Sequence, residues 1–147
     1  MTTTAPVADA RSLGLAHYAA RAALESVLSR HGLTFPQHIT LRSVVVAGAP
    51  VEHDALVAQV TGSLKMETAE ARDVVGELLG KGLLTAEATH VRAADAGRAL
   101  YAEVAAEAGE LSARIWSGIP AEDLAAAGRV LALVTERADA ELAAKRA

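Results

Sequence analysis

The sequence contains no cysteine among its 147 residues. This absence excludes disulfide bonds, thiolate catalysis and zinc sites built on cysteine. Aromatic residues make up only 3% of the chain, so its interfaces have to be built from leucine, valine and alanine packing. Apolar runs such as Val44–Ala47 are far too short to cross a bilayer, and we expect no membrane partner.

The chain also lacks an excess of positive charge. Its 14 lysines and arginines are outnumbered by 18 acidic residues, which gives a formal net charge of -4. Nucleic-acid binding depends on cations that neutralise phosphates, so any DNA-binding surface has to be local. The polar, threonine-rich residues 1–10 show no targeting pattern, and we expect a cytoplasmic protein.

Sequence motifs of common catalytic sites are missing as well. The sequence has no Gly-rich phosphate loop, no Walker motif and no Gly-x-Ser-x-Gly elbow, so nothing in it supports an enzyme. The spacing of its histidines does not match a metal-binding motif, although Glu52 or Asp54 could join them, and we predict neither a metal nor a cofactor. The five histidines are His17, His31, His38, His53 and His90.

Helical periodicity dominates what is present. Apolar residues recur at steps of three and four along residues 9–30, which predicts an amphipathic helix. Pro36 is typical of the first turn of a second helix, entered through Thr34 or Phe35. Residues 48–50 break this second helix.

The second half of the chain begins with two further helices and a hairpin. A third helix is predicted over residues 53–60, and a fourth over residues 68–81 with Thr68 as its N-cap. Alternation then predicts two short strands, at residues 83–86 and 89–92.

Two more helices complete the predicted order of elements. Asp95 is expected to cap a fifth helix, and residues 117–120 separate it from a last one. The apolar stripes of the first, fifth and last helices have no obvious cover within one chain, which favours a homodimer over an intrachain bundle.

Three runs carry a family resemblance: Leu33–Leu41, Leu78–Leu84 and Ala96–Tyr101. Their order and spacing resemble those of the MarR family of bacterial regulators. The resemblance implies a mainly α fold with a small β-hairpin wing, a winged helix-turn-helix flanked by N- and C-terminal dimerisation helices. It implies one domain over residues 1–147, with the winged lobe at 33–92 and the dimerisation helices at 9–31 and 95–145.

The resemblance also implies which residues contact double-stranded DNA. The helix at residues 68–81 would enter the major groove of an operator, with Arg72 reading bases. The other expected DNA contacts are Lys65, Thr68 and Arg92. Two departures from the family pattern are visible: the hairpin tip has no arginine, and four carboxylates surround Arg72. These are Glu67, Glu70, Asp73 and Glu77.

In proteins of the resembled family, effectors bind where the first, second and fifth helices meet. A small aromatic or carboxylate ligand is therefore expected there, with His38 and Arg42, one turn apart on one helix, as its polar anchors. Plain packing is the alternative for the aromatic residues, above all Tyr18 and Trp116. The expected ligand-binding residues are His17, Tyr18, His38, Arg42, Tyr101 and Trp116.

Two functional hypotheses follow from this sequence. The first is a homodimeric, ligand-responsive, DNA-binding transcriptional regulator. The second is a MarR-like protein that has lost DNA binding and binds or converts a small molecule in the crevice between its lobes. The framework of the fold favours the first hypothesis, and the acidic fourth helix favours the second.

Overall fold

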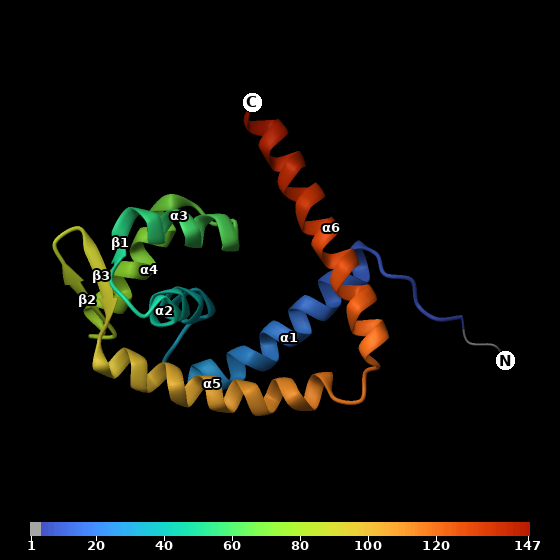
Figure 1. Cartoon of the computed structure of the whole chain (residues 1–147), viewed down its shortest axis with the longest axis horizontal. Helices are drawn as coiled ribbons and strands as arrows, with labels where there is room; N and C mark the ends of the chain where they lie inside the picture. The colour runs from blue at the N-terminus through green and yellow to red at the C-terminus, as the bar shows by residue number, and fades with distance from the viewer. Residues whose placement is uncertain (1–3) are drawn as a thin grey trace. The chain divides into compact units, whose positions relative to one another are not determined.

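The computed structural model describes residues 4–147, and residues 1–3, the start of the polar N-terminal segment, lie outside the described part. The helices are α1 (Ala10–Arg30), α2 (Phe35–Ala47), α3 (His53–Leu64), α4 (Thr68–Gly80), α5 (Asp95–Trp116) and α6 (Ala121–Arg146) (Figure 1). The strands are β1 (Val51–Glu52), β2 (Leu84–Glu87) and β3 (His90–Ala93). The predicted fold class, a mainly α winged helix-turn-helix with a small hairpin wing, is confirmed.

The contacts divide the chain into two compact units, one through Leu111 and one from Ser112 onward. The division falls inside α5. The first unit contains the hydrophobic core, whereas no residue of 112–147 is buried. The predicted break at residues 117–120 is confirmed, because α5 ends at Trp116 and α6 begins at Ala121.

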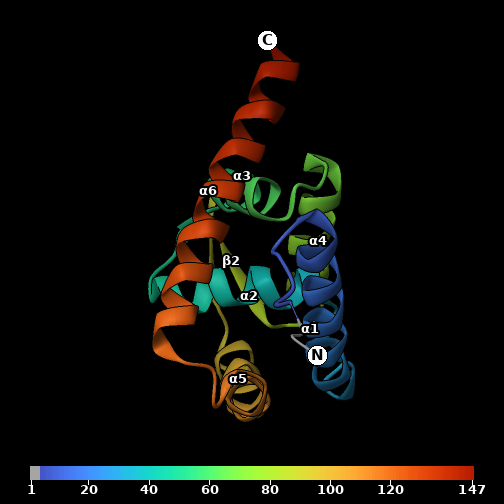
Figure 2. The same ribbon diagram turned by 90° about the vertical axis from the view of Figure 1, so that its right-hand side faces the viewer.

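The core of the first unit forms between α2, α3, α4 and the sheet. In both views α2 lies between α3 and α5 (Figures 1 and 2). Buried leucines and valines from every one of these elements fill the space between them. The largest fully buried apolar side chains are Leu28, Leu41, Leu56, Leu78, Val44, Val60, Val75, Val91 and Val104.

Side-chain caps fix the starts of the first two helices. Asp9 caps α1 in a reciprocal pair with Ser12. Thr34, rather than Phe35, caps α2: its hydroxyl accepts from the Gln37 N–H, and the Gln37 side chain accepts from the Thr34 N–H. Pro36 lies in the first turn, as predicted.

Three predicted helix boundaries were wrong. α3 continues past Val60 to Leu64, because Leu64 packs against the core and offsets the low helix propensity of the preceding glycine. The N-cap of α4 is Glu67 and not Thr68, since the first bond of the helix runs from the Ala71 N–H to the Glu67 carbonyl. Asp95 is the first helical residue of α5 rather than its cap.

The hairpin lies one residue later than predicted. Leu83 belongs to the turn that follows α4, where its N–H donates to the Leu78 carbonyl, so β2 begins at Leu84. The turn then falls at Ala88, which has a positive φ of 51°. β1, which was not predicted, pairs with β3 and gives the antiparallel strand order β1-β3-β2.

A glycine fixes the N-terminus of α5 against the winged lobe. A Cβ on Gly97 would lie 2.1 Å from the Leu83 carbonyl oxygen, so only glycine fits without a backbone shift. The Ala94 N–H donates to the same oxygen. This close approach gives a packing reason for the Ala96-Gly97-Arg98 run singled out in the sequence.

Candidate nucleic-acid interface and ligand sites

One face of α4 is exposed to solvent along its whole length. Its opposite face, from Ala71 to Leu78, is buried in the core. Thr68 and Arg72, four residues apart, lie on the same exposed side, as a helix requires. The carboxylates expected to surround Arg72 are exposed as well: Glu67, Glu70, Asp73 and Glu77.

Glu77 also holds α4 in place. Its carboxylate accepts a 2.6 Å hydrogen bond from the Gln37 side chain on α2. The Lys81 ammonium donates to the Gln37 side-chain oxygen at 3.2 Å and to the Gly32 carbonyl at 2.5 Å. The C-terminal end of α4 is thereby fixed to the turn between α1 and α2. The sequence interpretation missed Gln37, whose place three residues after Thr34 was the available signal.

The remaining expected DNA contacts come from two different elements. Lys65 is exposed at the end of α3, with φ of 54°, in the turn that leads to Thr68. Arg92 instead lies on β3, half-buried, with its Nε donating to Glu87 at 2.5 Å. Lys65, Thr68 and Arg72 are therefore grouped on the helix-turn-helix, whereas Arg92 belongs to the wing.

His38 is buried on α2, and its ring stacks against Tyr101 of α5 with 6.2 Å between centroids. Its Nδ1 is a buried atom with no hydrogen-bond partner. Burial, with a smaller contribution from the charge of Arg42, lowers the pKa of His38 below its usual value. His38 is therefore neutral near pH 7 and has an unsatisfied ring nitrogen.

The other expected ligand-binding residues do not join this group within the first unit. His17 and Tyr18 are exposed on α1, where their rings meet edge to face at 5.9 Å. Trp116 is exposed in the second unit. Among the six expected residues, the structure brings together His38, Arg42 and Tyr101.

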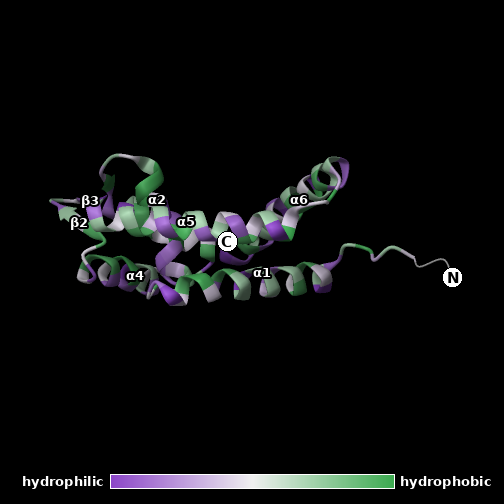
Figure 3. Ribbon diagram, turned by 90° about the horizontal axis from the view of Figure 1, so that it is seen from below, coloured by the Kyte–Doolittle hydropathy of each residue, from purple (hydrophilic) through white to green (hydrophobic). Residues whose placement is uncertain are grey.

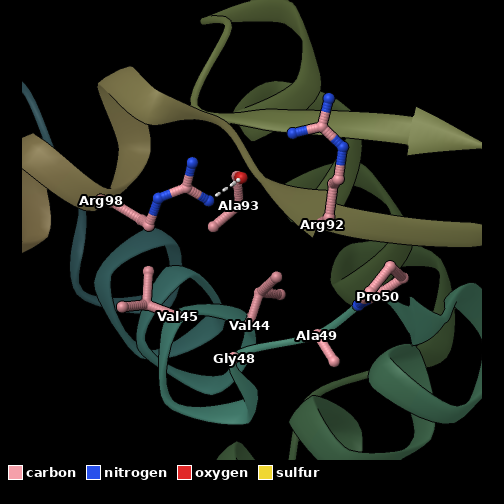
Figure 4. A pocket seen from close by; sticks show the side chains of 8 residues that line it. All are labelled: Val44, Val45, Gly48, Ala49, Pro50, Arg92, Ala93 and Arg98. Carbon is pink, nitrogen blue, oxygen red and sulfur yellow. Dashed lines mark hydrogen bonds between the residues drawn. The ribbon is translucent and has the colours of Figure 1, made fainter.

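A small cavity of about 140 Å³ lies between α2, β3 and the first turn of α5 (Figure 4). Sequence reasoning predicted no site here. The break at residues 48–50 and the Gly97-Arg98 pair were its sequence signals. We call it the arginine cavity, and its lining residues are Val44, Val45, Gly48, Ala49, Pro50, Arg92, Ala93 and Arg98.

Neither a group of metal-binding side chains nor a membrane-spanning helix occurs in the described residues. Within residues 4–147, no three acidic or histidine side chains are grouped closely enough to hold a metal ion. No helix in this range combines the length and apolarity needed to cross a membrane.

The fold matches solved structures of MarR-family regulators. A MarR-family transcriptional regulator from Rhodococcus sp. RHA1 is 18% identical, with 84% of this chain and 90% of that chain covered and a TM-score of 0.72. Ligand-free NadR is 17% identical, covering 91% and 98%, with a TM-score of 0.75. Staphylococcus aureus MarR, solved in complex with salicylate and kanamycin, is 17% identical, covering 89% and 90%, with a TM-score of 0.75.

No protein-family model matches the sequence, and no curated protein matches it either. At these identities the structural likeness establishes the MarR fold for this chain. The recognition of a MarR-type winged helix from three short runs is confirmed at that level.

Proposed function

We propose that this chain is a homodimeric, DNA-binding transcriptional regulator of the MarR type that responds to a small ligand in the cytoplasm. The observation that carries the proposal is the exposed face of α4, the second helix of a helix-turn-helix, beside the β2–β3 wing. Such units place the N-terminal half of the second helix in the major groove.

In this proposal Arg72 reads base edges, because it is the arginine on the exposed face of α4. Thr68 and Lys65, at the start of α4 and the preceding turn, contact phosphates, and Arg92 contributes from the wing. Since few cations are available and carboxylates surround Arg72, the affinity should depend only weakly on salt concentration.

A binding selection on genomic DNA at low salt tests the regulator. We expect an enriched, pseudo-palindromic sequence, and Arg72→Ala should weaken binding to it by about 1–3 kcal/mol and relax its sequence preference. Arg11 is an exposed arginine at the start of α1, and Arg11→Ala is the matched control. This variant should bind the enriched sequence as tightly as the wild type does. Recovery of no enriched sequence would reject the regulator.

The second candidate function is a MarR-fold protein without DNA binding that binds or converts a small molecule. The observation in its favour is the group of exposed carboxylates on α4, which phosphates would repel. The turn at Ala88 likewise offers DNA no cation. The same selection separates the two candidates, because only the first predicts an enriched sequence.

The homodimer is supported by the exposed apolar side chains of α6, a helix that contains both polar and apolar residues (Figure 3). Leu131, Leu133 and Val134 are 45%, 48% and 42% exposed in the single chain. Monomeric proteins rarely leave such a contiguous surface uncovered. Leu131→Glu should convert a dimer into a monomer, because a buried unpaired carboxylate is costly. Sedimentation showing a wild-type monomer at micromolar concentration would contradict the dimer.

The ligand site of this proposal is the group formed by His38, Arg42 and Tyr101. A neutral imidazole with an unpaired Nδ1 and a neighbouring guanidinium suit a phenolic or carboxylate ligand. In the version of the protein that converts its ligand, His38 is the first candidate acid or base.

Calorimetry with salicylate tests this placement, since salicylate combines an aromatic ring with a carboxylate. We expect His38→Ala and Arg42→Ala each to weaken binding, by about tenfold where a charged hydrogen bond is lost. Arg11→Ala again serves as the control. Unchanged affinity in both variants would show that the ligand binds elsewhere.

A further inference from the structure

We propose that the arginine cavity is a second ligand site, which takes a small carboxylate with an apolar body. The site is distinct from the group of His38, Arg42 and Tyr101, because none of these residues lines it. The inference does not depend on DNA binding, since every feature that supports it is a property of the cavity itself.

The floor of the cavity is apolar. Val44 is 1% exposed and Ala93 is 6% exposed, so both belong to the hydrophobic core beneath the cavity. Val45 and the ring of Pro50 complete this surface (Figure 4). A hydrocarbon group placed here loses contact with water and gains contact with four carbon surfaces. The floor therefore favours a ligand with an organic body over a bare inorganic anion.

The rim of the cavity is cationic. Arg98 rises from the first turn of α5, with its guanidinium beside Ala93, and Arg92 rises from β3, with its side chain extending toward the neighbouring strand (Figure 4). A guanidinium group has five N–H donors in a planar fork that matches a carboxylate. Two such groups above one apolar floor provide the charge and the donors for a single anionic head group.

Each arginine retains donors for a ligand. Arg92 uses its Nε for Glu87, so this bond occupies neither of its terminal nitrogens. Arg98 donates from one terminal nitrogen to the Ala93 carbonyl at 2.7 Å and from the other to Asp95. Each of these nitrogens carries a second hydrogen, and the Arg98 Nε carries one more.

The carboxylates that already pair with the arginines do not block an anion. The side chains of Arg92 and Glu87 are 41% and 49% exposed, and those of Arg98 and Asp95 are 51% and 98% exposed. Ion pairs this exposed contribute little to stability, because water screens them. A ligand carboxylate whose body is buried on the floor adds apolar contact that the exposed carboxylates lack.

One feature of the backbone opposes an anion. α2 ends at the cavity, and the carbonyl end of a helix carries partial negative charge. The Gly48 N–H donates to the Val45 carbonyl at 3.2 Å, so part of this charge is already satisfied. The two guanidinium groups at the rim, each beside an exposed carboxylate, are the positive charges that face the remaining partial charge.

The volume limits the size of the ligand. Sites for drug-sized molecules usually measure about 300–1,000 Å³. The arginine cavity, at about 140 Å³, is clearly smaller. It accommodates a single ring or a short branched chain with one carboxylate, or the acidic end of a longer molecule. Benzoate is a suitable probe, because it combines one ring with one carboxylate.

The experiment is an NMR titration of the ¹⁵N-labelled full chain with benzoate, benzamide and inorganic phosphate at constant ionic strength. Benzoate should give saturable shifts at the amides of Gly48, Ala93 and Arg98. Benzamide keeps the ring and loses the charge, so it should bind at least about tenfold more weakly. Phosphate keeps the charge and lacks the apolar body, and it should also bind more weakly than benzoate.

Two variants test the two halves of the cavity. Arg92→Gln removes one charge at the rim and should weaken benzoate about tenfold. Val45→Phe keeps both arginines but fills the floor, and it should abolish the shifts at Gly48 and Ala93. Arg11→Gln, on α1 outside the cavity, should bind benzoate like the wild type. Thermal unfolding of each variant verifies that it is folded.

Several results would overturn the proposal. Shifts confined to His38 and Tyr101 would place benzoate in the other ligand site. If benzamide binds as tightly as benzoate, the charge of the ligand is not needed for binding. If phosphate binds as tightly as benzoate, contact with the apolar floor is not needed. Full affinity retained by both Arg92→Gln and Val45→Phe, or an absence of saturable shifts, would show that the cavity is not a ligand site.

Discussion

The winged lobe and the last helix of this chain differ in how far their apolar side chains are exposed to solvent. Leu41 on α2 is 0% exposed, whereas Leu131 on α6 is 45% exposed. The lobe completes its core within one chain, since α2, α3, α4 and the sheet cover one another. α6 has no buried residue at all. In the proposed dimer, a second copy of the chain covers these apolar side chains.

A second contrast, in charge, lies within the first unit. The exposed face of α4, where a DNA-reading helix needs cations, carries Arg72 among several carboxylates. The rim of the arginine cavity carries Arg92 and Arg98 above an apolar floor. Carboxylates lie beside the arginines in both places, but only Arg92 and Arg98 line a cavity with an apolar floor, which suits a small organic anion better than a phosphate backbone. The carboxylates on α4 bear on the choice between the two candidate functions, and the arginines of the cavity bear on the proposed second ligand site.

The comparison between the lobe and α6 predicts that equal truncations have different effects. Leu41→Ala should lower the free energy of unfolding by about 2–5 kcal/mol, because it leaves a cavity in the core. Its effect on self-association should be small. Leu131→Ala should instead raise the dissociation constant of the dimer. Urea unfolding and sedimentation equilibrium measure the two effects. Normal self-association of Leu131→Ala would show that this side chain is not at the dimer interface.

A pair of glycines tests the close approach of α5 to the lobe. Gly97→Ala should destabilise the protein by about 1–3 kcal/mol, because the new Cβ requires the backbone at Leu83 to move. Gly76→Ala on α4 meets nothing within 4 Å, so it should stabilise its helix by up to about 1 kcal/mol. Thermal unfolding distinguishes the two. Equal effects in the two variants would contradict the close contact.

Much of the fold could be predicted from the sequence, since its elements carry local signals. Periodicity located all six helices, and Thr34 with Pro36 marked the start of α2. The errors occurred where contacts between residues distant in the sequence determine the end of an element or its presence. α3 extends to Leu64 because that residue reaches the core, and β1 exists because β3 lies beside it. Neither contact is visible in a single run of residues.

The candidate sites were less predictable than the fold. The exposed face of α4 followed from helical spacing, and the residues expected to point outward from this helix are exposed. The arginine cavity combines residues from α2, β3 and α5 that are up to 54 positions apart, from Val44 to Arg98. Such a site depends on how the elements pack, and the break at residues 48–50 and the Gly97-Arg98 pair do not by themselves indicate that these segments meet.

Buried His38 makes the lobe sensitive to acid. Its pKa is lowered in the folded protein, chiefly by burial, while the unfolded chain keeps the usual value of 6.5. The unfolded state therefore binds a proton more readily, so this contribution to stability is complete above pH 6.5 and is lost as the pH falls toward the lower folded pKa.

His38→Phe tests this effect, because it keeps an aromatic ring against Tyr101 and removes the titrating group. The wild type should lose more stability than the variant between about pH 7 and pH 5, as measured by urea unfolding. Subtracting the two pH profiles removes the contributions of the other ionisable groups. Parallel profiles would show that the His38 proton is not linked to folding.

The smallest expected effect concerns the turn of the wing. Ala88 has a φ of 51°, a region that costs a residue with a Cβ about 1–2 kcal/mol and costs glycine almost nothing. Glycine also increases the entropy of the unfolded chain, which offsets part of this gain. Ala88→Gly should therefore stabilise the protein by a net amount of about 0.5–1 kcal/mol.

Ala86→Gly is the matched control for this turn, because Ala86 lies two residues earlier in β2, paired with Val91 in extended backbone. There glycine relieves no strain and only adds freedom to the unfolded chain, so the variant should be less stable than the wild type. Thermal unfolding of both variants measures the difference. If Ala88→Gly destabilises the protein as much as Ala86→Gly does, Ala88 does not hold a left-handed conformation and the turn of the wing must lie at other residues.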